Sequence, residues 1–217
     1  PVPAGEGSAL LDLHTAVFGL RFHQLAHPEY APIFFKQAKY TLLDQNTFWL
    51  CEKPDSVGMV GWDAALTRIA TWVKLQDKKT GQILMVVNTH FDHIGTEARR
   101  NSALLIIEKI KEIVGTSPAI LTGDFNVSED WDAYKTITNN EFILKDAHKV
   151  AGKRTGVDFT YHNFGKIPAE KCEKIDFIFV TPQIRVISSY IPFSQLNDTL
   201  FLSDHNPEIV ELEIEKS

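Results

Sequence analysis

Three short polar runs stand at or near positions where apolar strands are expected to end, and each carries side chains that can do chemistry. Gly123–Asn126 follows the apolar residues Ile120 and Leu121, Asn88–His93 follows an apolar run, and Ser203–Pro207 lies near the end of the chain. In open α/β sheets, functional groups gather at the carboxyl ends of strands. Carboxylate and amide oxygens are ligands that suit hard cations such as Mg²⁺. The three runs therefore predict one polar site built from distant parts of the chain.

Each run also has a structural interpretation when it is taken alone. Asp124 and Asn126 stand two residues apart, so on an extended chain they share one face and could hold a cation, a water or a phosphate oxygen. A turn is an equally good interpretation of this run, because Gly, Asp and Asn are common turn formers. A single histidine, such as His90, His93 or His205, is more often structural or exposed than catalytic. The occurrence of all three runs at strand ends favours chemistry.

Asp176 is a fourth candidate because it interrupts the otherwise apolar stretch Ile175–Val180. A buried carboxylate needs a partner, since burying an unpaired charge is costly. Histidine is the natural partner, because a carboxylate orients the imidazole ring and raises its basicity. The alternative is a carboxylate at the start of a strand that faces solvent.

Composition restricts the class of protein. The length of 217 residues fits a single domain, residues 1–217, with a sizeable core. The formal net charge of -6 argues against avid non-specific binding of nucleic acid, because such binding needs a basic surface. A local basic patch or a bound cation can offset the mean charge. Cys51 and Cys172 are too few for a disulfide framework, and free thiols are favoured.

No apolar run approaches the roughly 20 residues of a membrane span. The first residues lack the positive start and apolar core of a signal peptide. The sequence leaves both a cytoplasmic location and export after loss of a signal peptide open. We expect a monomer.

Hydrophobic periodicity predicts an α/β (α+β) fold in which strands pair as hairpins, one helix crosses over, and further hairpins follow. The helix predicted over residues 131–138 has Ser128 or Asp130 as its candidate N-cap. Helices are predicted over residues 8–20, 98–114 and 131–138. Strands are predicted over residues 30–36, 66–75, 83–91, 119–121, 175–180, 186–191 and 209–214.

In this order, Asn88–His93, Gly123–Asn126, Ile175–Phe177 and Ser203–Pro207 resemble the motifs of the endonuclease/exonuclease/phosphatase superfamily, over roughly residues 29–214. Each phrase alone is a weak signal, whereas four in the right order are a strong one. The resemblance implies a four-layer αββα sandwich of two mixed, mainly antiparallel sheets with the site at one rim.

Three further features resemble bacterial members of that superfamily and receive no role from the sequence. They are the pair Trp62 and Asp63, the residue Arg68, and the run Thr160–Phe164.

The resemblance also implies roles for the polar residues at the strand ends. The implied metal ligands are Asp204, Asp124 and Asn126, holding Mg²⁺, with Mn²⁺ as the alternative. The residues implied in the reaction are His90, Asp124, Asn126, Asp176, His205 and Glu29. In this scheme His205, oriented by Asp176, acts on the attacking water or the phosphate, and Asp124 positions or deprotonates the water. Asn126 holds a phosphate oxygen, and His90, paired with Glu29, contacts the phosphate.

These roles agree with the chemistry of phosphate ester hydrolysis. The reaction requires neutralisation of charge that develops on the phosphate oxygens, together with activation of a water molecule. A divalent cation supplies the first requirement, and a set of Asp and His side chains supplies the second.

The start of the chain departs from the superfamily pattern. The early strand carrying an Asn, and the Gln-Glu pair that supplies a principal metal-binding Glu, are not found, and Glu6 lacks the apolar strand that should precede it. We expect a chain that is truncated or altered before about residue 29. We also expect it to bind Mg²⁺ more weakly than a member with the early Glu, because fewer anionic ligands hold a hard cation less tightly.

The sequence thus predicts a divalent-metal-dependent phosphoesterase that hydrolyses a phosphate mono- or diester of unidentified structure. One alternative is a DNA or RNA nuclease, for which a basic cluster beside the site would be the mark. The candidates for such a cluster are Arg99, Arg100, Lys153 and Arg154. Another alternative is a catalytically impaired binding domain, which the unlocated metal-binding Glu favours and the intact Asp and His residues oppose.

Overall fold

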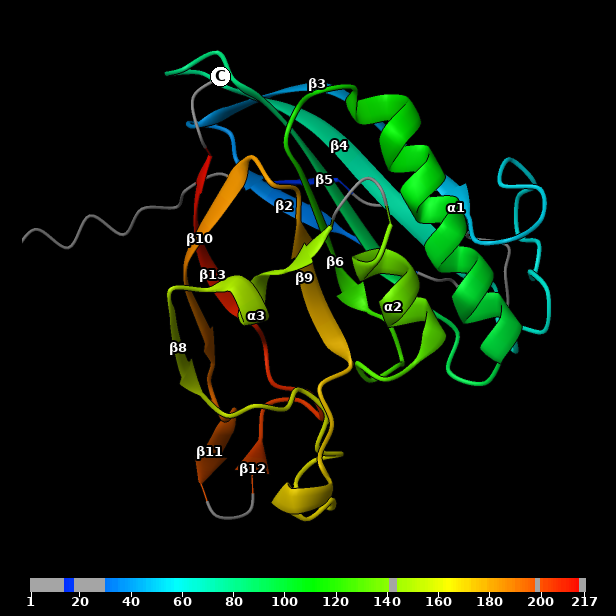
Figure 1. The fold of residues 1–217 in the computed structure, drawn as a ribbon, viewed down its shortest axis with the longest axis vertical. Coiled ribbons are helices and arrows are strands. Elements are labelled where there is room, and N and C mark those ends of the chain that lie inside the picture. The colour runs from blue at the N-terminus through cyan, green and yellow to red at the C-terminus, as the bar shows by residue number, and fades with distance from the viewer. Residues whose placement is uncertain (1–13, 18–29, 141–143, 198–199, 215–217) are drawn as a thin grey trace, which may run out of the picture.

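A computed structural model describes residues 14–17, 30–140, 144–197 and 200–214. Its main feature is a mixed six-stranded sheet with the strand order β3-β4-β5-β6-β9-β7 (Figure 1). The strands are β3 (Tyr40–Trp49), β4 (Ile69–Asp77), β5 (Ile83–His90), β6 (Ala119–Asp124), β7 (Lys145–Asp146) and β9 (Asp176–Val180). Only β5 and β6 run parallel in this sheet.

A smaller mixed sheet has the order β13-β10-β8, formed by β8 (Lys153–Gly156), β10 (Ile184–Ile191) and β13 (Ile209–Ile214). Two short antiparallel ribbons accompany the sheets. One pairs β1 (His14–Val17) with β2 (Ile33–Lys36), and the other pairs β11 (Gln195–Asn197) with β12 (Leu200–Phe201). A single turn of 3₁₀ helix, η1, covers Ala169–Lys171.

Two helices, α1 (Thr96–Val114) and α2 (Asp132–Thr138), cover one face of the large sheet (Figure 1). The apolar positions of α1, such as Ile106 and Ile110, recur at helical spacing and are buried against the sheet with Phe125. The short helix α3 (Ala147–Val150) lies beside β9 and β10. In the part of the chain that the structure describes, no helix is long and apolar enough to cross a membrane.

The opposite face of the large sheet packs on the smaller sheet. Leu84 and Val180 from the large sheet meet Ile184 and Val186 of β10 in one buried cluster. Val210, Leu212 and Ile214 of β13 pack against the same cluster and are partly buried. Two packed mixed sheets with helices outside confirm the predicted fold class.

The structure corrects the prediction at the beginning of the chain. Residues 8–20 were expected to form a helix, yet His14–Val17 form strand β1, in antiparallel register with Ile33–Lys36. Pairing with a neighbouring strand supplies hydrogen bonds that a short helix has to supply alone, and tertiary context often overrides helix propensity. The remaining residues of the predicted helix lie outside the described ranges.

Two local predictions also differ from the structure. Neither Ser128 nor Asp130 caps α2, because the N-cap is Trp131 without a side-chain bond, and the Ser128 hydroxyl donates to Asp130 instead. The ten-residue strand β3 was not predicted. Its central residues Asp44, Gln45 and Asn46 are exposed, so they interrupt the apolar alternation that identifies a strand.

Candidate active site

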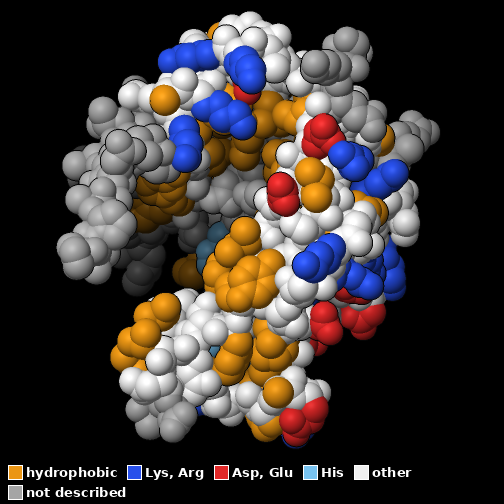
Figure 2. All heavy atoms as spheres, turned by 90° about the vertical axis from the view of Figure 1, so that its left-hand side faces the viewer, with side chains coloured by type: hydrophobic (Ala, Val, Ile, Leu, Met, Phe, Trp, Pro, Cys, Tyr) orange, Lys and Arg blue, Asp and Glu red, His pale blue; other side chains and the backbone are white. Residues whose placement is uncertain are grey.

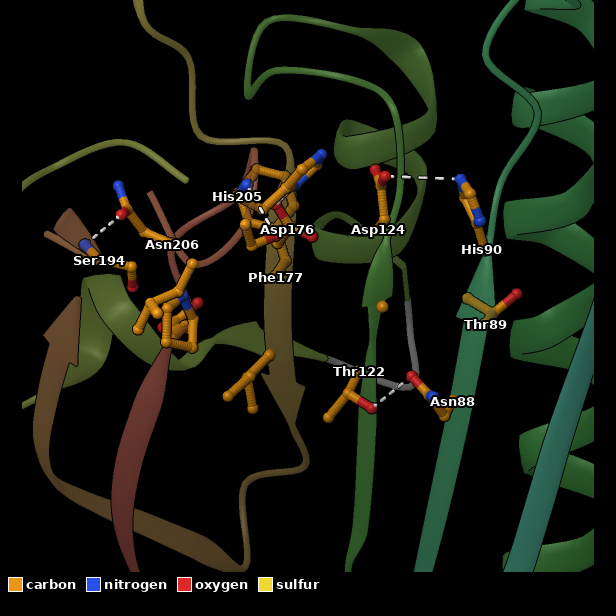
Figure 3. A pocket seen from close by; sticks show the side chains of 16 residues that line it. Asn88, Thr89, His90, Thr122, Asp124, Asp176, Phe177, Ser194, His205 and Asn206 are labelled. Carbon is orange, nitrogen blue, oxygen red and sulfur yellow. Dashed lines mark hydrogen bonds and ion pairs between the residues drawn. The ribbon is translucent and has the colours of Figure 1, made fainter. Parts of the chain in front are cut away.

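Three neighbouring strands place polar residues in one row across the large sheet. His90 of β5 is the register partner of Asp124 of β6, and Asp124 is the register partner of Asp176 of β9. Register partners lie side by side on the same face of a sheet. His205 reaches the row from the loop before β13, and Figure 3 shows these four side chains along one rim. Sequence segments more than a hundred residues apart thus meet at the predicted site.

Asp176 and His205 form a hydrogen-bonded pair. The Nδ1 atom of His205 donates to Oδ2 of Asp176 at 2.7 Å, which confirms the predicted hydrogen bond. With Nδ1 engaged in this way, Nε2 is the ring nitrogen left for a substrate or a water. Burial lowers the pKa of His205, but the hydrogen bond and the charge of Asp176 outweigh it, so the pKa is raised above its usual value. The pair therefore holds a ring that gains a proton readily.

Asp124 faces a second carboxylate. Burial and the negative charge of Asp176 raise the pKa of Asp124, against the opposing effect of His90. One oxygen of Asp124 accepts the Asn126 N–H at 2.9 Å, and the other lies 3.5 Å from Nε2 of His90. Two carboxylates this close repel each other unless a proton or a cation lies between them. The Asp124 carboxyl is thus poised to bind one or the other.

The donor set fits a hard divalent cation. One ligand atom each from Asp124, Asp176 and His205 lies within 4.8 Å of the other two, and two of the three are carboxylates. A cation here would relieve the repulsion that raises the pKa of Asp124. Asp124, a predicted ligand, belongs to this cluster.

The other two predicted ligands are placed beside the cluster. Asp204 precedes His205 and is not a member of the cluster in the described chain; its Oδ1 accepts from the Ser203 hydroxyl at 3.3 Å. Asn126 lies just after the end of β6 with a left-handed φ of 50°. Its side-chain Nδ2 donates to the carbonyl oxygen of Phe91 at 3.0 Å, which fixes the direction of the amide. Glu29, predicted to pair with His90, lies outside the described residues, as does Glu6.

A cleft of about 710 Å³ opens beside this row, between strands β5, β6 and β9 and the segment that precedes β13. Figure 2 shows a hollow with histidine in it and hydrophobic side chains at its border. No Lys or Arg is found among the described residues that line the cleft. The lining residues are Asn88, Thr89, His90, Thr122, Gly123, Asp124, Asp176, Phe177, Ile178, Ser194, Leu202, Ser203, His205, Asn206, Pro207 and Glu208.

Part of the Asn88–His93 run serves the structure instead of the site. Asp92 is buried, and its carboxylate accepts the N–H groups of Leu66, Ile94 and Gly95 at 3.2, 2.9 and 2.7 Å. His93 accepts a hydrogen bond from Arg68 at 3.2 Å on the same side. Asp63 accepts the N–H groups of Glu97 and Ala98 at the start of α1. Asp63 and Arg68, two of the features shared with bacterial members of the superfamily, therefore belong to a structural cluster.

Two residues in or beside the cleft, Glu208 and Tyr161, received no role from the sequence. Glu208 lines it and forms a buried ion pair with Lys174, with 2.9 Å between Nζ and Oε2. Tyr161 forms an isolated antiparallel bridge with His205, and the centroids of their rings are 4.9 Å apart. The signal for Tyr161 was its place in the Thr160–Phe164 run; Glu208 had no signal beyond an acidic residue following Pro207.

Residues 19–205 match the profile of the Endonuclease/Exonuclease/phosphatase family. The chain belongs to this family. Members of the endonuclease/exonuclease/phosphatase family are in general hydrolases that act on phosphate esters. The order of the strand-end motifs and their meeting at one rim agree with this membership.

Two solved structures from Bacteroides species and one viral sequence are similar to the chain. A family protein of Bacteroides vulgatus is 60% identical, with a TM-score of 0.88 over 93% of this chain and 77% of that chain. The mannosyl-6-phosphatase Bt3783 of Bacteroides thetaiotaomicron is 33% identical, with a TM-score of 0.83 over the same shares. An uncharacterized protein of Acanthamoeba polyphaga mimivirus is 30% identical over 76% of this chain, which spans 63% of that relative's length.

Proposed function

We propose that this chain is a divalent-metal-dependent phosphoesterase that hydrolyses a phosphate monoester, with sugar phosphates as the first class of substrate. The observation that carries the proposal is the row of Asp124, Asp176 and His205 at one rim, with their ligand atoms within 4.8 Å. The 33% identity to a mannosyl-6-phosphatase supports the choice of a sugar phosphate.

The chain's own residues divide the work of moving protons and charge. Asp176 fixes the ring of His205, whose raised pKa favours the imidazolium that offsets negative charge on the phosphate. Asp124, with a raised pKa, positions the attacking water and accepts its proton. Asn126 and His90 bind phosphate oxygens at the ends of β6 and β5.

Asp124, which belongs to the cluster with Asp176 and His205, would hold Mg²⁺, or Mn²⁺ with the same donors, and Asn126 and Asp204 beside the cluster would supply further oxygen ligands. A bound cation would neutralise charge on the phosphate oxygens and lower the pKa of water. The ligand atom of Asp124 lies within 4.8 Å of those of Asp176 and His205, so the cation and the His205 ring would act on the same phosphate.

The charges around the cleft favour a small phosphate ester over nucleic acid. Arg99 is buried, donates to the carbonyl oxygen of Asp92 and lies over the Trp131 ring. Arg154 lines a separate cavity, and Arg100 and Lys153 are exposed without lining the cleft. Since nucleic-acid binding depends on cations along the phosphate backbone, these placements give a nuclease no support.

A hydrolysis panel tests the proposal. Mannose 6-phosphate, p-nitrophenyl phosphate, bis(p-nitrophenyl) phosphate, plasmid DNA and abasic DNA are incubated with the chain in Mg²⁺, Mn²⁺ or EDTA. We expect cation-dependent phosphate release from the monoesters, faster than cleavage of the diesters. Faster cleavage of DNA would replace the proposal with a nuclease. Failure on every substrate, with rates equal to those of His205→Asn, would favour a binding domain.

A further inference from the structure

The Thr160–Phe164 run received no role from the sequence, and Thr160 is completely buried, at 0% exposure. We infer that Thr160 is a positioning residue that holds Asp176 and His205 at hydrogen-bonding distance. The inference rests on the proposed function only in the claim that this pair takes part in hydrolysis. The placement of the pair can be measured without any substrate.

The side chain of Thr160 sets where β9 begins. Its Oγ1 accepts the backbone N–H of Ile175 and the backbone N–H of Asp176, both at 3.0 Å. A hydroxyl oxygen has two lone pairs, so these two bonds use its full accepting capacity. Asp176 is the first residue of β9, and its N–H has this hydroxyl as its acceptor. The hydroxyl therefore fixes the backbone from which the Asp176 carboxylate extends.

The main chain of Thr160 holds the other half of the pair. Its carbonyl oxygen accepts the N–H of Asn206, the residue after His205, at 2.6 Å. Asn206 is buried, and its side-chain oxygen accepts the Ser194 N–H at 2.8 Å, as Figure 3 also shows. The next residue, Tyr161, bridges to His205 in antiparallel fashion. One residue thus bonds to the segments that carry both members of the pair.

This arrangement explains how the start of β9 and the distant segment that carries His205 meet with a 2.7 Å hydrogen bond. Asp176 and His205 are separated by 29 positions in the chain. The backbone N–H of Asp176 donates to the Thr160 hydroxyl, and the backbone N–H of Asn206, the residue after His205, donates to the Thr160 carbonyl oxygen. Removal of the hydroxyl leaves two backbone N–H groups without their acceptor, and the start of β9 shifts to find another. A misplacement of about 1 Å at a reacting group can cost about 100-fold in rate. We therefore expect a loss in kcat with little change in KM.

The test compares three changes at Thr160 with a matched control. Thr160→Val keeps the shape and removes the acceptor, Thr160→Cys weakens it, and Thr160→Ser keeps it. The control is Thr181→Val, because the buried Thr181 hydroxyl accepts the Ala119 N–H at 3.0 Å, just past the opposite end of β9. Each variant is measured for kcat and KM on p-nitrophenyl phosphate with Mg²⁺, and for thermal unfolding.

Proton NMR supplies a reading that needs no activity. The Nδ1 proton of His205, donated to a carboxylate, gives a downfield signal that is assigned by its loss in His205→Asn. We expect this signal in the wild type, Thr160→Ser and Thr181→Val. We expect it weakened or shifted upfield in Thr160→Cys and Thr160→Val. We expect kcat to follow the NMR signal: it falls about 10- to 100-fold in Thr160→Val and stays close to the wild-type value in Thr160→Ser.

The outcomes separate the two claims. An unchanged Nδ1 signal and kcat in Thr160→Val would overturn the role of Thr160, as would an equal loss of kcat in Thr181→Val. If Thr160→Val does not fold, Thr160→Cys decides in the same way. If the wild type hydrolyses no phosphate ester, the proposed function fails, and the NMR signal still decides whether Thr160 positions the pair.

Discussion

The end of β5 separates two clusters of charged side chains that are built from the same residue types. On one side, His90 faces Asp124 and Asp176 in the cleft. On the other, Asp92 and Asp63 lie at the start of α1. The carboxylates at α1 accept backbone N–H groups, with donor distances from 2.6 to 3.2 Å. The carboxylates in the cleft face each other and a histidine.

The two clusters shift the pKa of a carboxyl in opposite directions. Burial raises the pKa of Asp92, but the N–H groups of Gly95, Ala65, Ile94 and Leu66 outweigh it and lower the value to about 2. Burial and a neighbouring carboxylate raise the pKa of Asp124. A carboxylate whose lone pairs are filled by its own chain contributes to stability. One that meets another negative charge is available to a proton, a cation or a substrate.

The largest effect expected from this contrast is the loss of turnover in Asp176→Asn. The change removes the charge that orients the His205 ring and favours its protonated form. The contribution of a positioned acid or base is typically about 10²- to 10⁴-fold in rate. We expect kcat to fall within about that range, while the melting temperature changes little. Steady-state kinetics and thermal unfolding of the same preparation measure both. Parallel losses of activity and stability would give Asp176 a structural role.

Asp92→Asn should show the reverse pattern. A pKa shift from 3.8 to about 2 corresponds to about 2 kcal/mol of stabilisation at neutral pH, since each unit is about 1.4 kcal/mol. We expect the free energy of unfolding in urea to fall by about that amount, with kcat per folded molecule retained. If kcat falls and stability does not, the division between the two clusters is wrong.

The dependence of stability on acidic pH is a second test of the contribution of the Asp92 carboxylate to folding. The folded pKa of Asp92 is depressed, so its contribution is fully present above 3.8 and is lost as the pH falls through about 2. Urea unfolding of the wild type between those values should show a decrease in stability that Asp92→Asn lacks. Identical pH profiles would show that other carboxyls dominate acid unfolding.

Asp63→Ala is expected to have the smallest effect. Its carboxylate accepts the N–H groups of Ala98 and Glu97, which lower its pKa, but the group is exposed to solvent at the surface. We expect a decrease in unfolding free energy of less than half that of Asp92→Asn, with kcat unchanged. A loss equal to that of Asp92→Asn would mean that the start of α1 depends on both carboxylates alike.

Much of the site could be predicted because strand ends are visible in the sequence. The apolar run before Asp124 places this residue at the carboxyl end of a strand, where functional groups gather. Asp176 is a carboxylate in an apolar stretch, which indicates a histidine as its partner. The division of Asn88–His93 was not predictable. After β5 ends, the chain no longer follows the alternation of a strand, so nothing local shows that Asp92 turns toward α1 while His90 stays in the row.

The fold was predictable where the hydrophobic periodicity is clear. It was not predictable where the formation of an element depends on pairing with a distant part of the chain. Helix α1 and strand β13 were predicted to within two residues, because their apolar spacing is regular. Strand β3 has exposed polar residues at its centre, and β1 depends on pairing with β2. The role of Thr160 depends on three hydrogen bonds to residues 15 to 46 positions away, which no local pattern encodes.

The dependence of phosphate release on Mg²⁺, in the wild type and in Asp124→Asn, is the most direct test of the proposal that Asp124 holds a cation needed for hydrolysis. Both proteins are stripped with EDTA and titrated with Mg²⁺ on one phosphate monoester, with Asp92→Asn as the control. We expect no release in EDTA, saturable release in the wild type and Asp92→Asn, and a slower reaction that needs more Mg²⁺ in Asp124→Asn. Release in EDTA, or identical titrations for the wild type and Asp124→Asn, would contradict it.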